Sequence, residues 1–124
     1  MKVKRVRIGI KSLKSILDDF AETAGAIEAG DRVVSQKGLY FESIEGFRRA
    51  LTTKRLELLH VIRKKKPKSL QGLSRTTNRD MKSIVQDVSI LEELGLLDMK
   101  RSRKGRRESM PTVSYDRLDL QMAV

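Results

Sequence analysis

The hydrophobic period of this sequence changes at Gly95, and this change limits the possible folds more than any other feature. Before Gly95, apolar residues recur at three- and four-residue spacing, at Met81, Val85, Val88, Leu91 and Leu94. This spacing predicts an amphipathic helix over 81–94 with those residues facing inward, and a glycine directly after it is a common helix end. After Gly95, residues 96–99 and 108–115 predict two strands joined by a basic turn.

Shorter helices are expected before the long one. Ser69 is placed to cap a short helix, and a break at residues 76–78 separates this helix from the long one. Thr77 and Asp80 have the spacing of a capping box at the start of the long helix. Two further helices are expected upstream, beginning at Ser43 and Thr52, with the second ending before Pro67.

The first 42 residues follow a different pattern. Residues 6–10 alternate between apolar and polar or small side chains, which predicts a strand. Apolar spacing after Ser12 predicts a helix ending at Gly30, and residues 31–42 suggest an extended connector with room for a short strand. Residues 118–124 alternate again and predict a last strand. This strand is expected to pair with the first strand, either in the same chain or in a partner copy.

The charge of the chain is clustered. Lys and Arg number 27 against 16 Asp and Glu, a formal net charge of +11. Residues 63–79 carry +7 and residues 100–110 carry +5, whereas residues 11–31 carry −3. Dense clusters of one sign favour a polyanion partner, and nucleic acid is the leading candidate. Residues 63–68 suit equally a DNA flank or a solvated helix end, because cations also favour helix C-termini.

Several classes of function are excluded or disfavoured. The sequence has no Cys and only one His, so thiolate metal sites and disulfides are excluded and we expect no metal, no cofactor and no catalytic site. No apolar run is long enough to span a membrane, no secretory signal is visible, and we expect a cytoplasmic protein. Tyr40, Phe41 and Phe47 suit a core better than a platform for single-stranded bases or RNA.

The long predicted helix has base-contacting side chains near its amino end and acidic ones, such as Glu92 and Glu93, in later turns. Its amino end is therefore expected to face DNA, with the basic turn beside it. Asn also tolerates the left-handed conformation, so Asn78 suits either a structural role in the turn or a contact with DNA. The expected DNA-binding residues are Ser69, Asn78, Arg79, Lys82, Ser83, Gln86, Arg101, Arg103, Lys104, Arg106 and Arg107.

Three segments, residues 41–45, 91–96 and 114–118, resemble small prokaryotic winged helix-turn-helix transcriptional regulators of the MarR/ArsR-like superfamily. They are similar to a subgroup with an N-terminal strand and helix, as residues 7–10 and the following helix suggest here. The resemblance implies a mainly α fold with a small β component (α+β). Residues 1–42 would form a strand-helix-connector for dimerisation or partner docking, and residues 43–124 the winged helix-turn-helix.

The resemblance implies a sequence-specific regulator of transcription that binds double-stranded DNA, and a repressor in particular. A homodimer is expected, because one recognition helix reads too few base pairs and such modules usually bind paired half-sites. The subgroup also includes antitoxins. The alternative function is therefore an antitoxin that binds a small protein toxin through the acidic helix expected over 11–31 and regulates its own promoter.

Overall fold

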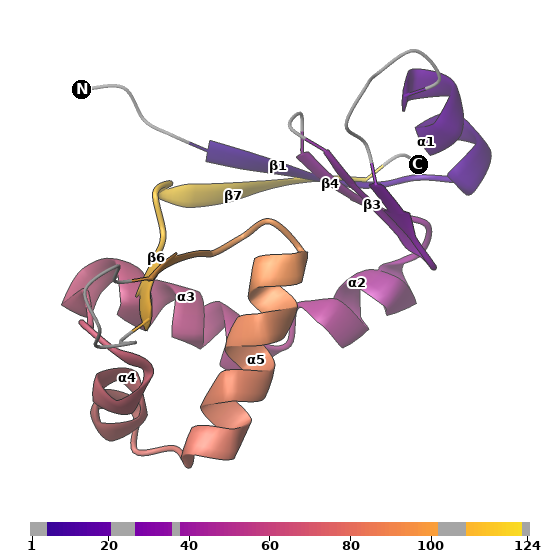
Figure 1. Ribbon diagram of the computed structural model, residues 1–124. Coiled ribbons are helices and arrows are strands. Elements are labelled where there is room, and N and C mark those ends of the chain that lie inside the picture. The colour runs from indigo at the N-terminus through magenta and orange to yellow at the C-terminus, as the bar shows by residue number, and fades with distance from the viewer. Residues whose placement is uncertain (1–4, 21–26, 36–37, 102–108, 123–124) are drawn as a thin grey trace. The chain divides into compact units, whose positions relative to one another are not determined.

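The computed structural model describes residues 5–20, 27–35, 38–101 and 109–122 (Figure 1). The chain divides into two units. The sheet unit comprises Met1–Leu51 and Tyr115–Val124, and the helical unit comprises Thr52–Ser114. This division differs from the predicted boundary after residue 42, because α2 contacts β4 and β7 pairs with β1.

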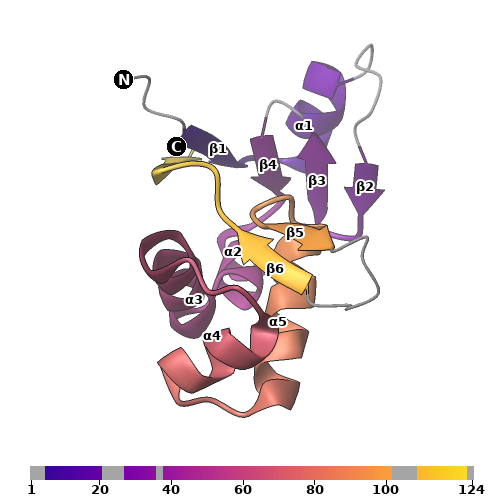
Figure 2. The ribbon, with the colours of Figure 1, turned by 60° about the vertical axis from the view of Figure 1, so that its left-hand side comes forward.

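The sheet unit is built on five described strands in the order β2-β3-β4-β1-β7, of which Figure 1 labels β3, β4, β1 and β7 and Figure 2 labels β2. Its elements are β1 Arg5–Ile10, α1 Leu13–Phe20, β2 Ile27–Ala29, β3 Arg32–Ser35, β4 Gly38–Phe41, α2 Ile44–Ala50 and β7 Arg117–Met122. The central strand β1 runs parallel to β4 and to β7, whereas β2, β3 and β4 are antiparallel neighbours. The first and last strands were predicted, and β7 pairs with β1 of the same chain.

The helix predicted after Ser12 is present as α1, and the Ser12 hydroxyl accepts from the Ser15 N–H. Its predicted end at Gly30 is wrong, and so is the continuous acidic helix over 11–31. Residues 27–29 form strand β2, which pairs with β3 across a two-residue loop of Gly30 and Asp31. Gly30 has a φ of +64, a conformation that glycine adopts without strain. Glycine followed by a polar residue is a hairpin signal as well as a helix end, and here the hairpin forms. The connector predicted over 31–42 contains two strands, β3 and β4.

Apolar residues cover both faces of this sheet. Ile16 of α1 packs with Val33 and Tyr40 in one buried cluster. Phe41 follows Tyr40 in β4 and therefore lies on the opposite face, where its ring meets the Phe47 ring of α2 edge to face at 5.8 Å. These aromatic residues are part of the core, as the sequence favoured.

In its described residues, the helical unit consists of three helices and a two-stranded antiparallel sheet (Figure 2). Its elements are α3 Thr53–Lys65, α4 Leu70–Thr77, α5 Met81–Glu93, β5 Asp98–Arg101 and β6 Ser109–Thr112. Thr52 and Ser69 cap α3 and α4, and Ser43 caps α2 in the sheet unit, all as predicted. The predicted capping box is wrong: Asp80 is itself the N-cap of α5, and the Thr77 hydroxyl donates to the carbonyl of Leu73 instead.

The inward face of α5 is rotated from the predicted one. Val88, Leu91 and Leu94 are buried as predicted, but Met81 and Val85 are exposed. The first turns of the helix are anchored by Ile84 instead, whose side chain is fully buried. Ile84, Val88 and Leu91 are spaced by four and then three residues, as are Met81, Val85 and Val88. The sequence therefore contained two overlapping apolar stripes on this helix.

The chain is a mixed α and β protein whose larger sheet exceeds the small β component predicted. Within the described ranges, no helix has the length and apolar character needed to cross a membrane.

Candidate nucleic-acid interface

Helices α4 and α5 are joined by a turn of residues 78–80 whose backbone is tightly bonded. Asn78 is left-handed, with φ 55 and ψ 42, and its N–H donates to the carbonyls of Arg75 and Ser74. The Arg79 N–H donates to the Ser74 carbonyl, and the Ser74 hydroxyl donates back to the Arg79 carbonyl. Asn78 therefore shapes the turn, which is one of the two roles open to it from the sequence.

The side chain of Arg79 is directed into the helical unit. Its guanidinium donates to the Ser83 hydroxyl and to the Asp87 carboxylate, each at 2.6 Å. Arg55 of α3 donates to the second oxygen of Asp87 at 3.0 Å. The three charged side chains are only 13–19% exposed. Arg79 and Ser83 were expected to contact DNA, but the structure engages both in holding α3, the turn and α5 together.

Asp87 remains ionised because of these two arginines. Burial alone would raise the pKa of its carboxyl group, but hydrogen bonds from Arg79 and Arg55 and their positive charges outweigh this effect. The pKa of Asp87 therefore lies below its ordinary value of 3.8. One acidic charge of α5 is thus neutralised inside the unit and does not oppose the approach of a polyanion.

The exposed face of α5 carries polar and apolar side chains together. Its exposed residues between positions 81 and 89 are Met81, Lys82, Val85, Gln86 and Ser89. Lys82 and Gln86 were predicted here, whereas the other three were missed. The helical spacing of Ile84, Val88 and Leu91 was the signal that would have predicted an outward position for Met81 and Val85. This face offers an ammonium group, an amide, a hydroxyl and two apolar contacts.

The remaining predicted residues have another role in the structure or lie outside the described residues. Ser69 accepts a hydrogen bond from the Gly72 N–H at 3.0 Å, so its hydroxyl serves first as a helix cap. Arg101 is the last residue of β5 and pairs with Ser109 of β6. Its side chain lies outside the described residues, as do Arg103, Lys104, Arg106 and Arg107 altogether.

Most of the net charge belongs to the helical unit. Residues 52–114 contain 16 Lys and Arg against 7 Asp and Glu, a net charge of +9. The other residues contain 11 against 9, a net charge of +2. A polyanion is therefore attracted to the unit that carries α5 far more than to the sheet unit.

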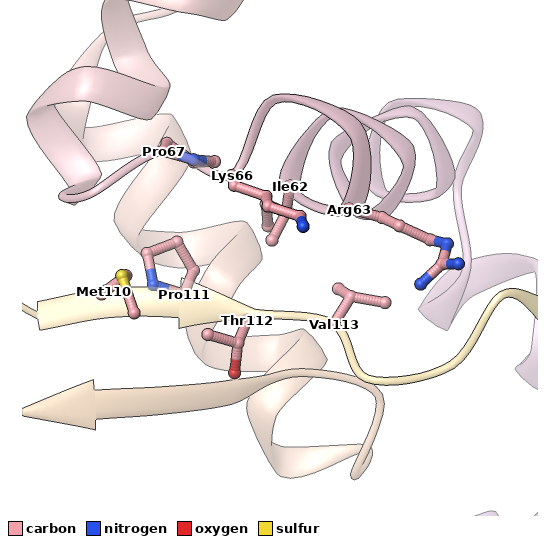
Figure 3. Close-up of a pocket in the computed structure, with 8 residues that line it drawn as sticks. All are labelled: Ile62, Arg63, Lys66, Pro67, Met110, Pro111, Thr112 and Val113. Carbon is pink, nitrogen blue, oxygen red and sulfur yellow. The ribbon is translucent and has the colours of Figure 1, made fainter. Parts of the chain in front are cut away.

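A separate cavity of about 320 Å³ lies between the end of α3 and strand β6 (Figure 3). Its lining residues are Ile62, Arg63, Lys66, Pro67, Met110, Pro111, Thr112 and Val113. None of the exposed residues of α5 contributes to it, so the cavity is distinct from the candidate interface.

The structure thus defines a mixed α and β protein with a strongly basic unit of three helices and a β-hairpin. Residues 50–120 match the HVO_A0114 family, which is more than half of the chain, and the chain belongs to that family. The matched range includes the whole of the helical unit. No curated protein and no solved structure shows a significant match to the chain.

Proposed function

We propose that the helical unit is a winged helix-turn-helix domain and that the protein regulates transcription by binding specific sequences in double-stranded DNA. In this proposal α5 is the recognition helix and β5 and β6 form the wing. The observation that carries it is the sorting of side chains on α5. Lys82, Gln86 and Ser89 are exposed, while Asp87 is turned inward and neutralised by two arginines.

The chemistry of that face matches the edges of bases in the major groove. Gln86 can bond adenine through both its amide oxygen and nitrogen, and Lys82 suits guanine or a phosphate. Met81 and Val85 are 38% and 46% exposed and supply apolar surface of the kind that contacts thymine methyl groups. The net charge of +9 supplies the attraction to phosphates that every sequence shares.

A regulator of this kind would act as a repressor in the cytoplasm and bind paired half-sites as a homodimer. Selection of bound sequences from random duplexes tests the proposal directly. A preferred sequence with two related half-sites supports it. Recovery of unrelated sequences with equal affinity would show a polycation without sequence preference.

Substitutions on α5 test which side chains read the sequence. We expect Gln86→Ala to reduce discrimination between the selected site and a site mutated at one position by about 1–3 kcal/mol. Lys82→Ala should weaken binding to all duplexes and, if Lys82 contacts a phosphate, lower the salt slope by about 1. Fluorescence anisotropy at several salt concentrations measures both effects.

Gln71→Ala provides the matched control, because Gln71 is an exposed glutamine of the same unit that lies on α4, outside the proposed recognition helix. Its sequence preference should equal that of the unaltered protein. If Gln86→Ala also leaves the preference unchanged, α5 does not read the bases as proposed.

Val85 provides a test at the level of one methyl group. Replacing thymine by uracil removes only the base methyl, and we expect a loss of about 0.8 kcal/mol at a position that Val85 covers, as for one buried CH₂ group. In the Val85→Ala variant the same replacement should cost much less, since the contact is already gone. Equal losses in the two proteins would show that Val85 does not meet a thymine.

A further inference from the structure

Strand β7 forms one edge of the five-stranded sheet and carries exposed apolar side chains. Its inner edge pairs with β1, and no described strand pairs with its outer edge. Leu120 and Met122 are 48% and 50% exposed, and Leu118 is half-buried. Since side chains alternate along a strand, these three residues share one face of the sheet.

This face is the continuation of a buried one. Ile8 and Ile10 of β1 lie opposite Leu120 and Met122 in the parallel register, so they point to the same side of the sheet. Ile8 is 1% exposed and Ile10 is 7% exposed. The apolar surface is thus covered at the centre of the sheet and uncovered on its edge strand.

The edge carries few of the features that keep edge strands apart. Proteins usually protect such edges with Lys or other charges, Pro or a bulge. Residues 117–122 contain neither Lys nor Pro, and their pairing with β1 is continuous. The carboxylate of Asp119 lies 3.4 Å from Arg5 and 3.4 Å from Arg117, so its negative charge is paired within the chain, and the one excess positive charge belongs to the first residues of β1 and β7.

We propose that β7 pairs antiparallel with β7 of a second copy of this chain, about a two-fold axis at Leu120. An axis perpendicular to the sheet keeps each residue on its own face, so facing residues must have the same parity. Centred on Leu120, this register sets Leu118 against Met122 and Asp119 against Gln121. Shifting the centre to Asp119 would bring two aspartates together, which is unfavourable.

The strand is therefore complementary to itself. A second copy would pair with the backbone groups of its outer edge and bring its apolar side chains into lateral contact with those of the partner strand. The pairing joins the two sheets into one and places three apolar residues from each copy side by side on one surface. It involves only the sheet unit and requires no DNA, so its test is independent of the proposed function.

Cysteine cross-linking tests the register, and the chain contains no Cys of its own. In the Leu120→Cys variant the two thiols face each other across the pair, with Cβ atoms about 4.5–5.5 Å apart, so that a small shift brings them to the distance of roughly 3.5–4.5 Å that a disulfide needs. In Gln121→Cys the two thiols are diagonal neighbours at about 7–8 Å and do not bond readily. Mild oxidation of the purified full chain should convert most of Leu120→Cys, and little of Gln121→Cys, to covalent dimer on a non-reducing gel. Equal conversion of the two variants, or none of Leu120→Cys, would overturn the register.

The mass in solution tests the dimer itself. By light scattering we expect twice 14.1 kDa for the unaltered chain and 14.1 kDa for Leu120→Lys. Leu17→Lys is the matched control, because Leu17 of α1 is a leucine of similar exposure, 43%, away from the edge. This control should remain dimeric. A monomeric unaltered chain, or a dimer that survives Leu120→Lys, would overturn the proposal.

Discussion

Replacing Asp87 by alanine is expected to destabilise the helical unit by about 3 kcal/mol, because removing one partner of a buried ion pair leaves the other charge uncompensated. Asp87 is 9% exposed and holds both Arg55 and Arg79. We place the effect at the low end of the usual range because each guanidinium keeps some contact with water. A loss of this size is a large fraction of the stability of a small unit. Urea unfolding followed by circular dichroism measures it.

Asp98→Ala provides the matched control, since Asp98 is an exposed aspartate of β5 in the same unit. Its stability should change by no more than about 0.5 kcal/mol, as for most surface substitutions. If Asp87→Ala is as mild as this control, the two arginines do not depend on Asp87, and the charge cluster is not what holds α3, the turn and α5 together.

The same cluster gives a pH dependence of known sign. The pKa of Asp87 is lowered in the folded protein, so its contribution is fully present above the ordinary value of 3.8 and is lost as the pH falls through the lower folded value. The stability difference between the unaltered protein and Asp87→Asn should therefore be constant near neutral pH and shrink below pH 3.8. A difference that shrinks instead near neutral pH would contradict a lowered pKa.

Gly38→Ala is expected to destabilise the sheet unit by about 3 kcal/mol, because it combines backbone strain with overpacking. Gly38 has a φ of +149, which L-residues rarely adopt. An added Cβ would also collide with the carbonyl oxygen of Arg7 in the neighbouring strand β1. This neighbour is backbone within a sheet and cannot turn aside. Thermal and urea unfolding measure the loss.

Gly30→Ala separates the two causes. Gly30 also has a positive φ, but no atom lies within 4 Å of the position of an added Cβ. We expect it to cost about 1–2 kcal/mol from the left-handed conformation alone. If both variants cost the same, contact with β1 contributes nothing at Gly38.

The helices of this chain could be predicted because their signals are local. Ser43, Thr52 and Ser69 each cap a helix through a hydrogen bond to a residue three positions later. The strands β2, β3 and β4 contain only three or four residues each and are held by pairing with other strands. Such short segments have too few apolar positions to reveal their period, so the sequence indicated a connector with room for one short strand.

The candidate interface was predicted in part for the same reason. Lys82 and Gln86 follow from helix periodicity alone, and both are exposed as expected. The position of Arg79 depends on Asp87 and that of Asp87 on Arg55, which lies 32 residues away along the chain. A partner so far away in the sequence does not affect the local spacing of residues, so the sequence predicted that Arg79 would be free to contact DNA.

The central place of β1 has a consequence for synthesis of the protein. β1 lies between β4 and β7, and the whole helical unit is encoded between those two neighbours. While residues 52–114 are being synthesised, β7 is not yet present, so β1 is an unpaired edge strand of the nascent sheet. The helical unit is contiguous in the sequence and can already fold at this stage. β7 can pair with β1 only after residues 117–122 have emerged from the ribosome. An interrupted translation product would therefore leave one edge of β1 unpaired and expose its apolar residues Val6, Ile8 and Ile10.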